Sequence, residues 1–244
     1  MSKLIEIIRK LGEQSQQPLG FGALAGRSEE APTLALIGTA TAADVGAELE
    51  AIKGDVVDAV ILEADGAVSI GDQDGMDGVV WGVGPGALSN EDVVGLVSAG
   101  CDFFVIDPDT APAAIVSQPD VDTLVTLKEP ADRETAAALR GLGVNGSLSR
   151  PPADLSEIGY RDLVAIRRMG ASVGGATLVE CPRDVSTADL TALRDAGVDA
   201  VVVPLSEPER VSDIAGKIRE LPPRRKSSGP GETRFQALAP TGSD

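Results

Sequence analysis

The sequence predicts a single (β/α)8 barrel, with a short amphipathic helix before it and a disordered tail after it. The chain has 244 residues, a length that barrels of this kind commonly use for one core. Short apolar runs recur eight times, and their starts are about 20 to 30 residues apart, which fits one strand followed by one helix. Hydrophobic residues make up 43 % of the chain but aromatic residues only 2 %, so Val, Leu, Ile and Ala are expected to fill the core.

The eight apolar runs are the predicted strands, at residues 34–39, 59–63, 79–83, 103–107, 124–127, 144–149, 176–181 and 200–205. Helical periodicity between them predicts helices at residues 42–53, 89–99, 131–141, 154–169, 187–196 and 208–220. Ser89, Asp154 and Thr187 are the predicted N-caps of three of these helices. Two connections are weaker, because residues 66–77 have the composition of a loop and residues 110–117 supply only two helical turns. A barrel with one degenerate βα unit, or an open seven-stranded sheet, is therefore an alternative.

A weak internal repeat supports the barrel. An Asp or Asn stands within two residues of the start of several predicted strands, at Asp58, Asp77, Asp102, Asn145 and Asp199. A helix that ends at Gly and leads at once into a buried parallel strand needs such a compact turn. The segment Ala-Gly-Val-Asp-Ala-Val-Val-Val at 196–203 resembles a phrase that recurs in TIM-type barrels. This resemblance implies the (β/α)8 fold over roughly 170 residues, and it implies no particular family.

The two ends of the chain differ from the barrel, so we divide it into residues 1–31, 32–221 and 222–244. In the first segment Leu4, Ile5, Ile8 and Leu11 form an apolar stripe at helical spacing. We expect this helix to pack on the bottom or outer layer of the barrel; contact with a membrane surface or self-association is the alternative. The last segment is rich in Ser, Gly and Pro and carries a small positive charge, so we expect a flexible basic tail.

Composition excludes several classes of function. The formal net charge of −17 disfavours binding of nucleic acid by the barrel. The chain has no histidine, which excludes imidazole acid–base catalysis and histidine-based zinc sites. Cys101 and Cys181 are far apart and are expected to be free buried thiols. No apolar run reaches the ~20 residues that span a bilayer and no signal peptide is recognisable, so we expect a cytoplasmic protein without a transmembrane segment.

The functional face of such a barrel is the carboxyl end of its strands, where the βα loops converge. Alternation along each strand predicts which side chains point inward there. It selects Glu63 and Asp65 on the second strand, Asp107 on the fourth and Lys128 on the fifth. On the sixth strand it selects Ser149, together with Asn145 and Ser147. The seventh strand is ambiguous, since Thr177 favours Cys181 inward and Glu180 outward.

These residues point to chemistry on a small, carboxylated molecule. Glu63, Asp65 and Asp107 offer only oxygen ligands, which favours Mg²⁺ or Mn²⁺ as a cofactor. Lys128 and Asp107 are the candidate catalytic residues of a metal- or lysine-assisted lyase or isomerase, because a lysine in a low-dielectric mouth acts as a base or a Schiff-base nucleophile. Candidate substrate contacts are Ser149, Cys181 and Gly84. Gly84 belongs to a Gly-rich turn whose backbone N–H groups are candidate donors to an anion.

Two alternatives stand beside this hypothesis. Lys128 could form a fixed ion pair with Asp107 or Glu63 that merely closes the top of the barrel. The whole barrel could instead be a non-catalytic scaffold or subunit that docks on a protein partner, or on itself, through its N-terminal helix or basic tail. Fold alone does not decide between an enzyme and a scaffold.

Overall fold

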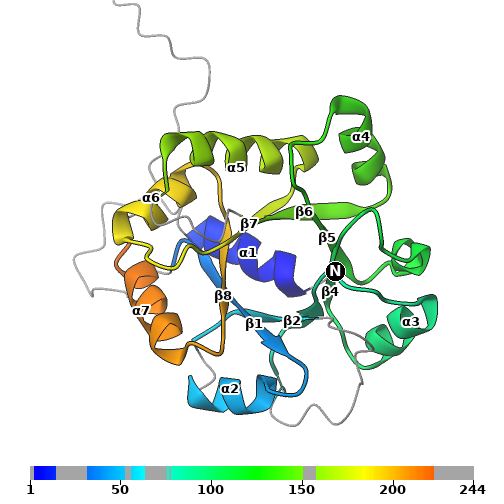
Figure 1. Cartoon of the computed structure of the whole chain (residues 1–244), viewed down its shortest axis with the longest axis horizontal. Coiled ribbons are helices and arrows are strands. Elements are labelled where there is room, and N and C mark those ends of the chain that lie inside the picture. The colour runs from blue at the N-terminus through cyan, green and yellow to red at the C-terminus, as the bar shows by residue number, and fades with distance from the viewer. Residues whose placement is uncertain are drawn as a thin grey trace, which may run out of the picture.

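The chain folds into a closed barrel of eight parallel strands in sequential order, with β8 pairing back onto β1 (Figure 1). The computed structural model describes residues 3–14, 32–52, 56–63, 76, 78–150 and 158–222. This closure confirms the (β/α)8 prediction and excludes the open seven-stranded alternative. The strands are β1 (Ala35–Thr41), β2 (Ala59–Glu63), β3 (Trp81–Val83), β4 (Phe103–Ile106), β5 (Asp122–Thr126), β6 (Val144–Ser149), β7 (Ala176–Glu180) and β8 (Ala200–Pro204).

Helices surround the barrel and cover the outer face of the sheet, as Figure 1 shows. The segment expected to supply two turns between β4 and β5 forms a short 3₁₀ helix, η1. The helix before β7 begins at Tyr160, later than predicted, and the predicted cap Asp154 lies outside the described residues. The bounds are α1 (Lys3–Gln14), α2 (Val45–Ala51), α3 (Asn90–Ser98), η1 (Ala113–Ser117), α4 (Arg133–Gly141), α5 (Tyr160–Val173), α6 (Thr187–Asp195) and α7 (Pro208–Arg219).

Two helices start with a capping box. Ser89 caps α3 as predicted, because its side chain accepts a hydrogen bond from the Asp92 N–H while the Asp92 carboxylate accepts one from the Ser89 N–H. The prediction for α6 was wrong by one residue: Ser186, and not Thr187, is the N-cap. Ser186 forms the same reciprocal pair with Asp189, which satisfies two N–H groups that the first turn would otherwise leave unpaired.

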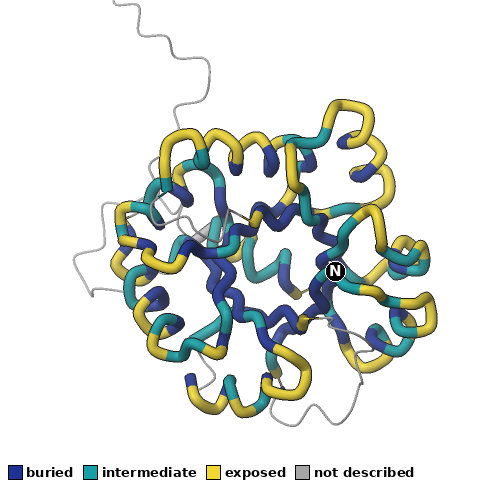
Figure 2. Tube along the Cα trace, viewed as in Figure 1, coloured by how far each residue is buried: buried dark blue, intermediate teal, exposed yellow. Residues whose placement is uncertain are grey.

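The core has two layers that alternate along every strand. Figure 2 shows buried strands inside a ring of helices whose outer faces are exposed. Side chains of one parity meet in the lumen of the barrel, and side chains of the other parity pack under the helices. The lumen cluster contains Leu4, Ala35, Ile37, Ala59, Ile61, Val80, Phe103, Val105, Leu124, Leu148, Ala176, Leu178, Ala200 and Val202.

Helix α1 closes the amino end of the barrel. Leu4 is fully buried within the lumen cluster, and Lys3 forms an ion pair with Asp102, directly before β4, at 3.2 Å. The space for Leu4 exists because four strands begin with alanine, at Ala35, Ala59, Ala176 and Ala200. The prediction that this helix packs on the bottom of the barrel is thus confirmed, and its apolar stripe is covered by the chain itself. None of the helices described is long and apolar enough to cross a membrane.

The Asp or Asn repeat has a structural role. Asp58 before β2 accepts a hydrogen bond from the Leu36 N–H of β1 at 2.8 Å, and Asp199 before β8 accepts one from the Thr177 N–H of β7 at 3.0 Å. Asn145 in β6 accepts one from the Thr123 N–H of β5 at 3.0 Å. Each side chain thereby replaces a backbone acceptor at the amino end of the preceding strand.

The repeat gives a pH-dependent prediction at Asp58. Burial raises the pKa of the Asp58 carboxyl, which the hydrogen bond from Leu36 only partly offsets. The folded state therefore holds the Asp58 proton more tightly than the unfolded chain, and stability falls as pH rises through that raised pKa. We expect Asp58→Asn, which keeps an acceptor of the kind Asn145 supplies, to raise the urea midpoint at pH 7 and to lose this advantage as the pH approaches the ordinary aspartate value.

Asp92→Asn is the matched control, because its effect on stability is expected to depend on pH in the opposite direction. Hydrogen bonds from Ser89 lower the pKa of Asp92, so its contribution to stability is present at neutral pH and is lost as pH falls. Urea titrations from pH 4 to 8 compare the two variants with the wild type. A midpoint for Asp58→Asn that lies below wild type at pH 7 contradicts the assignment.

Candidate functional site

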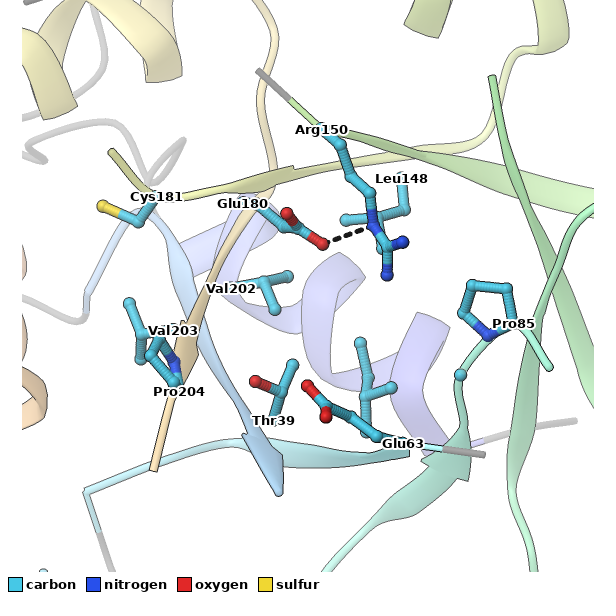
Figure 3. Close-up of a pocket in the computed structure, with 12 residues that line it drawn as sticks. Thr39, Glu63, Pro85, Leu148, Arg150, Glu180, Cys181, Val202, Val203 and Pro204 are labelled. Atoms are coloured by element: carbon cyan, nitrogen blue, oxygen red, sulfur yellow. Dashed lines mark ion pairs between the residues drawn. The ribbon is translucent and has the colours of Figure 1, made fainter. Parts of the chain in front are cut away.

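A cavity of about 410 Å³ opens at the carboxyl end of the barrel, opposite α1 (Figure 3). Its position is where barrels of this architecture bring their βα loops together. Residues from β1, β2, β6, β7 and β8 and from the turn after β3 surround it. Its lining consists of Thr39, Ile61, Glu63, Gly84, Pro85, Leu148, Arg150, Glu180, Cys181, Val202, Val203 and Pro204.

One wall of the cavity carries an ion pair between Arg150 and Glu180. Arg150 directly follows β6 and Glu180 ends β7, and these two strands are hydrogen-bonded neighbours. The Arg150 Nε lies 2.5 Å from Glu180 Oε1, with the two side chains 55 % and 37 % exposed. Both point into the cavity in Figure 3 because they share the parity of the inward-facing Leu148 and Leu178.

Glu63 and Thr39 lie on the opposite wall. Glu63 ends β2, and it faces inward because it continues the parity of Ala59 and Ile61, which belong to the lumen cluster. The predicted inward orientation of Glu63 is therefore confirmed. Glu63 and Thr39 line the cavity from the paired strands β2 and β1, and Figure 3 shows them across the cavity from Arg150. Within the described residues, Glu63 forms no ion pair.

The prediction for β6 was wrong, because Ser149 faces away from the lumen. Its hydroxyl donates to the sulfur of Met169 in α5 at 3.7 Å, while Leu148 points inward. Helix α5 packs very close to the sheet: a β-carbon on Gly170 would lie 2.3 Å from the Thr177 hydroxyl oxygen. Only small side chains such as Ser147 and Ser149 fit beneath such a helix, so polarity was the wrong guide to the inward face.

The ambiguity of β7 is resolved in favour of Glu180 inward and Cys181 outward. Cys181 belongs to the layer beneath the helices, and its sulfur points away from the other lining residues in Figure 3. Burial raises the pKa of the Cys181 thiol to about 11, against an opposing effect of Arg210. Cys181 thus borders the cavity as a small protonated side chain.

Asp107 and Lys128 do not line the cavity. β4 ends at Ile106, and the Asp107 carboxylate accepts a hydrogen bond from the Asp109 N–H at 3.0 Å, which shapes the turn. β5 ends at Thr126, and Lys128, two residues beyond the end of that strand, is exposed. The structure shows no ion pair between Lys128 and Asp107 or Glu63, three residues that it describes, so the alternative of a fixed ion pair at the top of the barrel is not supported.

Gly84 lies in the cavity wall, but its N–H group is already used. It donates to the Leu62 carbonyl oxygen at 2.7 Å, as a continuation of the pairing between β2 and β3. At the start of the following helix, Ser89 and Asp92 pair with each other's backbone N–H groups. Gly84 therefore contributes shape to the cavity, and its own N–H group is not available to an anion.

The structure describes two of the three carboxylates of the predicted cation site. Glu63 is in the cavity, Asp107 is engaged in its turn, and Asp65 lies outside the described residues. Among residues 3–14, 32–52, 56–63, 76, 78–150 and 158–222, no three Cys, Asp or Glu side chains gather closely enough to hold an ion. A bound Mg²⁺ or Mn²⁺ stays a prediction.

Sequence reasoning missed Arg150, Glu180 and Thr39. The available signal was Leu148, because a leucine has a stronger preference for the buried lumen than the serines on either side of it. Alternation along the strand then places Arg150, two residues later, on the same inward face. Leu178 does the same for Glu180. Thr39 follows Ala35 and Ile37 along β1.

Comparison with known proteins identifies the architecture. No protein-family model and no curated protein sequence matches the chain. Among solved structures, KGPDC from Streptococcus mutans is 11 % identical with a TM-score of 0.61 and covers 78 % of this chain and 99 % of its own. Thiamine phosphate pyrophosphorylase from Pyrococcus furiosus is 16 % identical with a TM-score of 0.54, covering 77 % and 98 %.

A Mycobacterium tuberculosis tryptophan synthase structure spans more of the chain. It is 13 % identical with a TM-score of 0.56 and covers 90 % of this chain and 95 % of its own. Likeness at these identities shows a shared fold and carries no information about chemistry. The chain is a TIM barrel at the level of fold.

Proposed function

We propose that the barrel mouth binds a small carboxylated molecule, with Arg150 as the partner of the carboxylate. The observation that carries this proposal is the orientation of the Arg150 guanidinium. Its Nε is paired with Glu180, which is the one ion-pair partner of Arg150 among the described residues, and Figure 3 shows the two terminal nitrogens directed into the cavity. A guanidinium held in this way presents a planar pair of donors that matches a carboxylate.

The rest of the cavity suits the carbon skeleton of such a ligand. Ile61, Leu148 and Val202 belong to the lumen cluster and form an apolar floor. A volume of about 410 Å³ lies within the usual range for small-molecule sites. Apolar surface with a few polar groups on the walls is the common composition of such sites.

The chemistry we propose is proton transfer of the kind that a lyase or isomerase requires. Glu63 is its acid or base, because its carboxylate faces the cavity from the wall opposite Arg150 and no described cation engages it. The lysine-assisted version of this hypothesis loses its support, since Lys128 is outside the lining. Asp107 loses its catalytic assignment for the same reason.

Arg150→Gln tests the proposal. We expect the variant to bind small carboxylates about 10 to 100 times more weakly, because a charge-assisted hydrogen bond is replaced by a neutral one. The measurement is ligand-observed NMR on straight-chain carboxylic acids of three to six carbons, followed by isothermal titration calorimetry on those that bind. The half-exposed position of Arg150 means that the variant should fold normally.

Arg168→Gln is the matched control. Arg168 is exposed on α5, outside the cavity, and its replacement should leave carboxylate binding unchanged. Equal affinities in wild type and Arg150→Gln, or the absence of any carboxylate binding to the wild type, contradict the proposed function.

A further inference from the structure

The charges on the cavity wall do not balance for a simple carboxylate ligand. Among the lining residues that the structure describes, Glu63 and Glu180 contribute two negative charges and Arg150 contributes one positive charge, a sum of −1. A ligand carboxylate would place three carboxylates around one guanidinium in about 410 Å³. Charges that share a partly desolvated space interact more strongly than they do in water, so this excess requires compensation.

Further negative charge lies behind the Glu63 wall. Glu48 of α2 has one carboxylate oxygen, Oε2, that is buried and has no hydrogen-bond partner among the described residues. Burial, and then the neighbouring carboxylates of Asp44 and Glu63, raise the pKa of Glu48. No ion pair joins any of these three acidic side chains to a described cation. This side of the mouth is therefore short of positive charge, whereas the Arg150 side is not.

We infer, on the basis of the proposed function, that the ligand is zwitterionic: its carboxylate meets Arg150, and a protonated amine on the same molecule meets Glu63 and Thr39. The amine supplies the missing positive charge on the wall where it is missing. Its N–H groups find two acceptors there, the Glu63 carboxylate and the Thr39 hydroxyl oxygen, which line the cavity from the paired strands β2 and β1 (Figure 3). The substrate class is an amino acid.

Two other classes of ligand fit the wall less well. A hydroxy acid donates one hydrogen bond to Glu63 but leaves the excess negative charge in place. A divalent cation would neutralise it, but the described residues lack the three acidic or thiol ligands that would hold one there. The amine is the group that satisfies both the charge and the hydrogen bonding.

A matched six-carbon series tests the inference by isothermal titration calorimetry. The probes are hexanoate, 2-aminohexanoate, 6-aminohexanoate and hexylamine, each with EDTA and again with MgCl₂. We expect at least one of the two amino acids to bind about tenfold more tightly than hexanoate in EDTA. In Glu63→Gln this preference should shrink to about twofold or less, while the affinity for hexanoate stays equal or increases. Glu220→Gln, an exposed glutamate at the end of α7, should keep the wild-type preference.

The failures of the two proposals are distinguishable. If hexanoate binds at least as tightly as both amino acids in EDTA, the zwitterion inference is wrong and the carboxylate site stands. If Mg²⁺ tightens hexanoate binding and the amine does not, a cation supplies the charge and the inference is overturned. If no carboxylate binds, or hexylamine binds as tightly as the amino acids, the proposed function itself fails.

Discussion

Replacement of Gly175 by alanine is expected to destabilise the barrel by about 3 to 5 kcal/mol. Gly175 leads from α5 into β7 with a φ of +75°, in the left-handed region that side chains disfavour. A β-carbon there would lie 1.8 Å from the carbonyl oxygen of Asn145 and 2.6 Å from its carbonyl carbon. Those atoms belong to the backbone of β6, so they cannot move without disturbing the pairing of β6 with its neighbours.

Gly174→Ala separates the clash from the backbone strain. Gly174 has a φ of +78°, and a β-carbon on it would meet no atom within 4 Å. This variant therefore carries the cost of a positive φ without the collision, and we expect it to be more stable than Gly175→Ala by about 2 kcal/mol or more. Guanidinium chloride unfolding, followed by circular dichroism, gives both values. Equal losses in the two variants would mean that β6 moves to admit the methyl group.

Leu4→Ala is expected to cost about 2 to 5 kcal/mol, the range for removing a fully buried leucine side chain from a core. Leu4 has no exposed surface, and it fills the amino end of the lumen among the alanines that begin four strands. The alanine variant leaves this space empty, because strands closed into a barrel cannot collapse onto it. The unfolding free energy from the same denaturant titration measures the loss.

Lys10→Ala is the control on the same helix. Lys10 and Glu6 form an exposed ion pair at 2.8 Å on the outer side of α1, and its loss should leave the unfolding midpoint unchanged within error. A Leu4→Ala variant as stable as Lys10→Ala would mean that α1 does not close the barrel in solution. The stripe formed with Ile5, Ile8 and Leu11 would then be available to a partner, as the scaffold alternative requires.

Several features of the fold followed from local pattern. The bounds of β2 and β6 agree with the predicted runs, and the Ser89 cap is where the sequence indicated it. Other bounds shifted because chain pairing, and not hydropathy alone, ends a strand. β3 is reduced to Trp81–Val83, although the apolar run begins at residue 79.

Side-chain direction at the mouth was harder to predict. Glu63 was placed correctly because large aliphatic residues on both faces of β2 gave one consistent alternation. On β6 and β7 the small residues Ser147, Ser149 and Thr177 suited either face, and the close approach of α5 decided their direction. Lys128 was misplaced for another reason: it lies two residues beyond the end of β5 at Thr126, whereas Arg150 directly follows β6 and keeps its alternation.

The sequence by itself determined the class of fold, the order of its elements and the amphipathic helix that closes one end, because hydrophobic periodicity and turn residues act within a few neighbours in the chain. Only the tertiary structure decided that Arg150 and Glu180 meet Glu63 around one cavity. That meeting depends on the register of strands that are distant in sequence, and on which of two possible faces each strand turns toward the lumen. Packing against α5 made that choice for β6, and the pairing of β6 with β7 then set Arg150 beside Glu180.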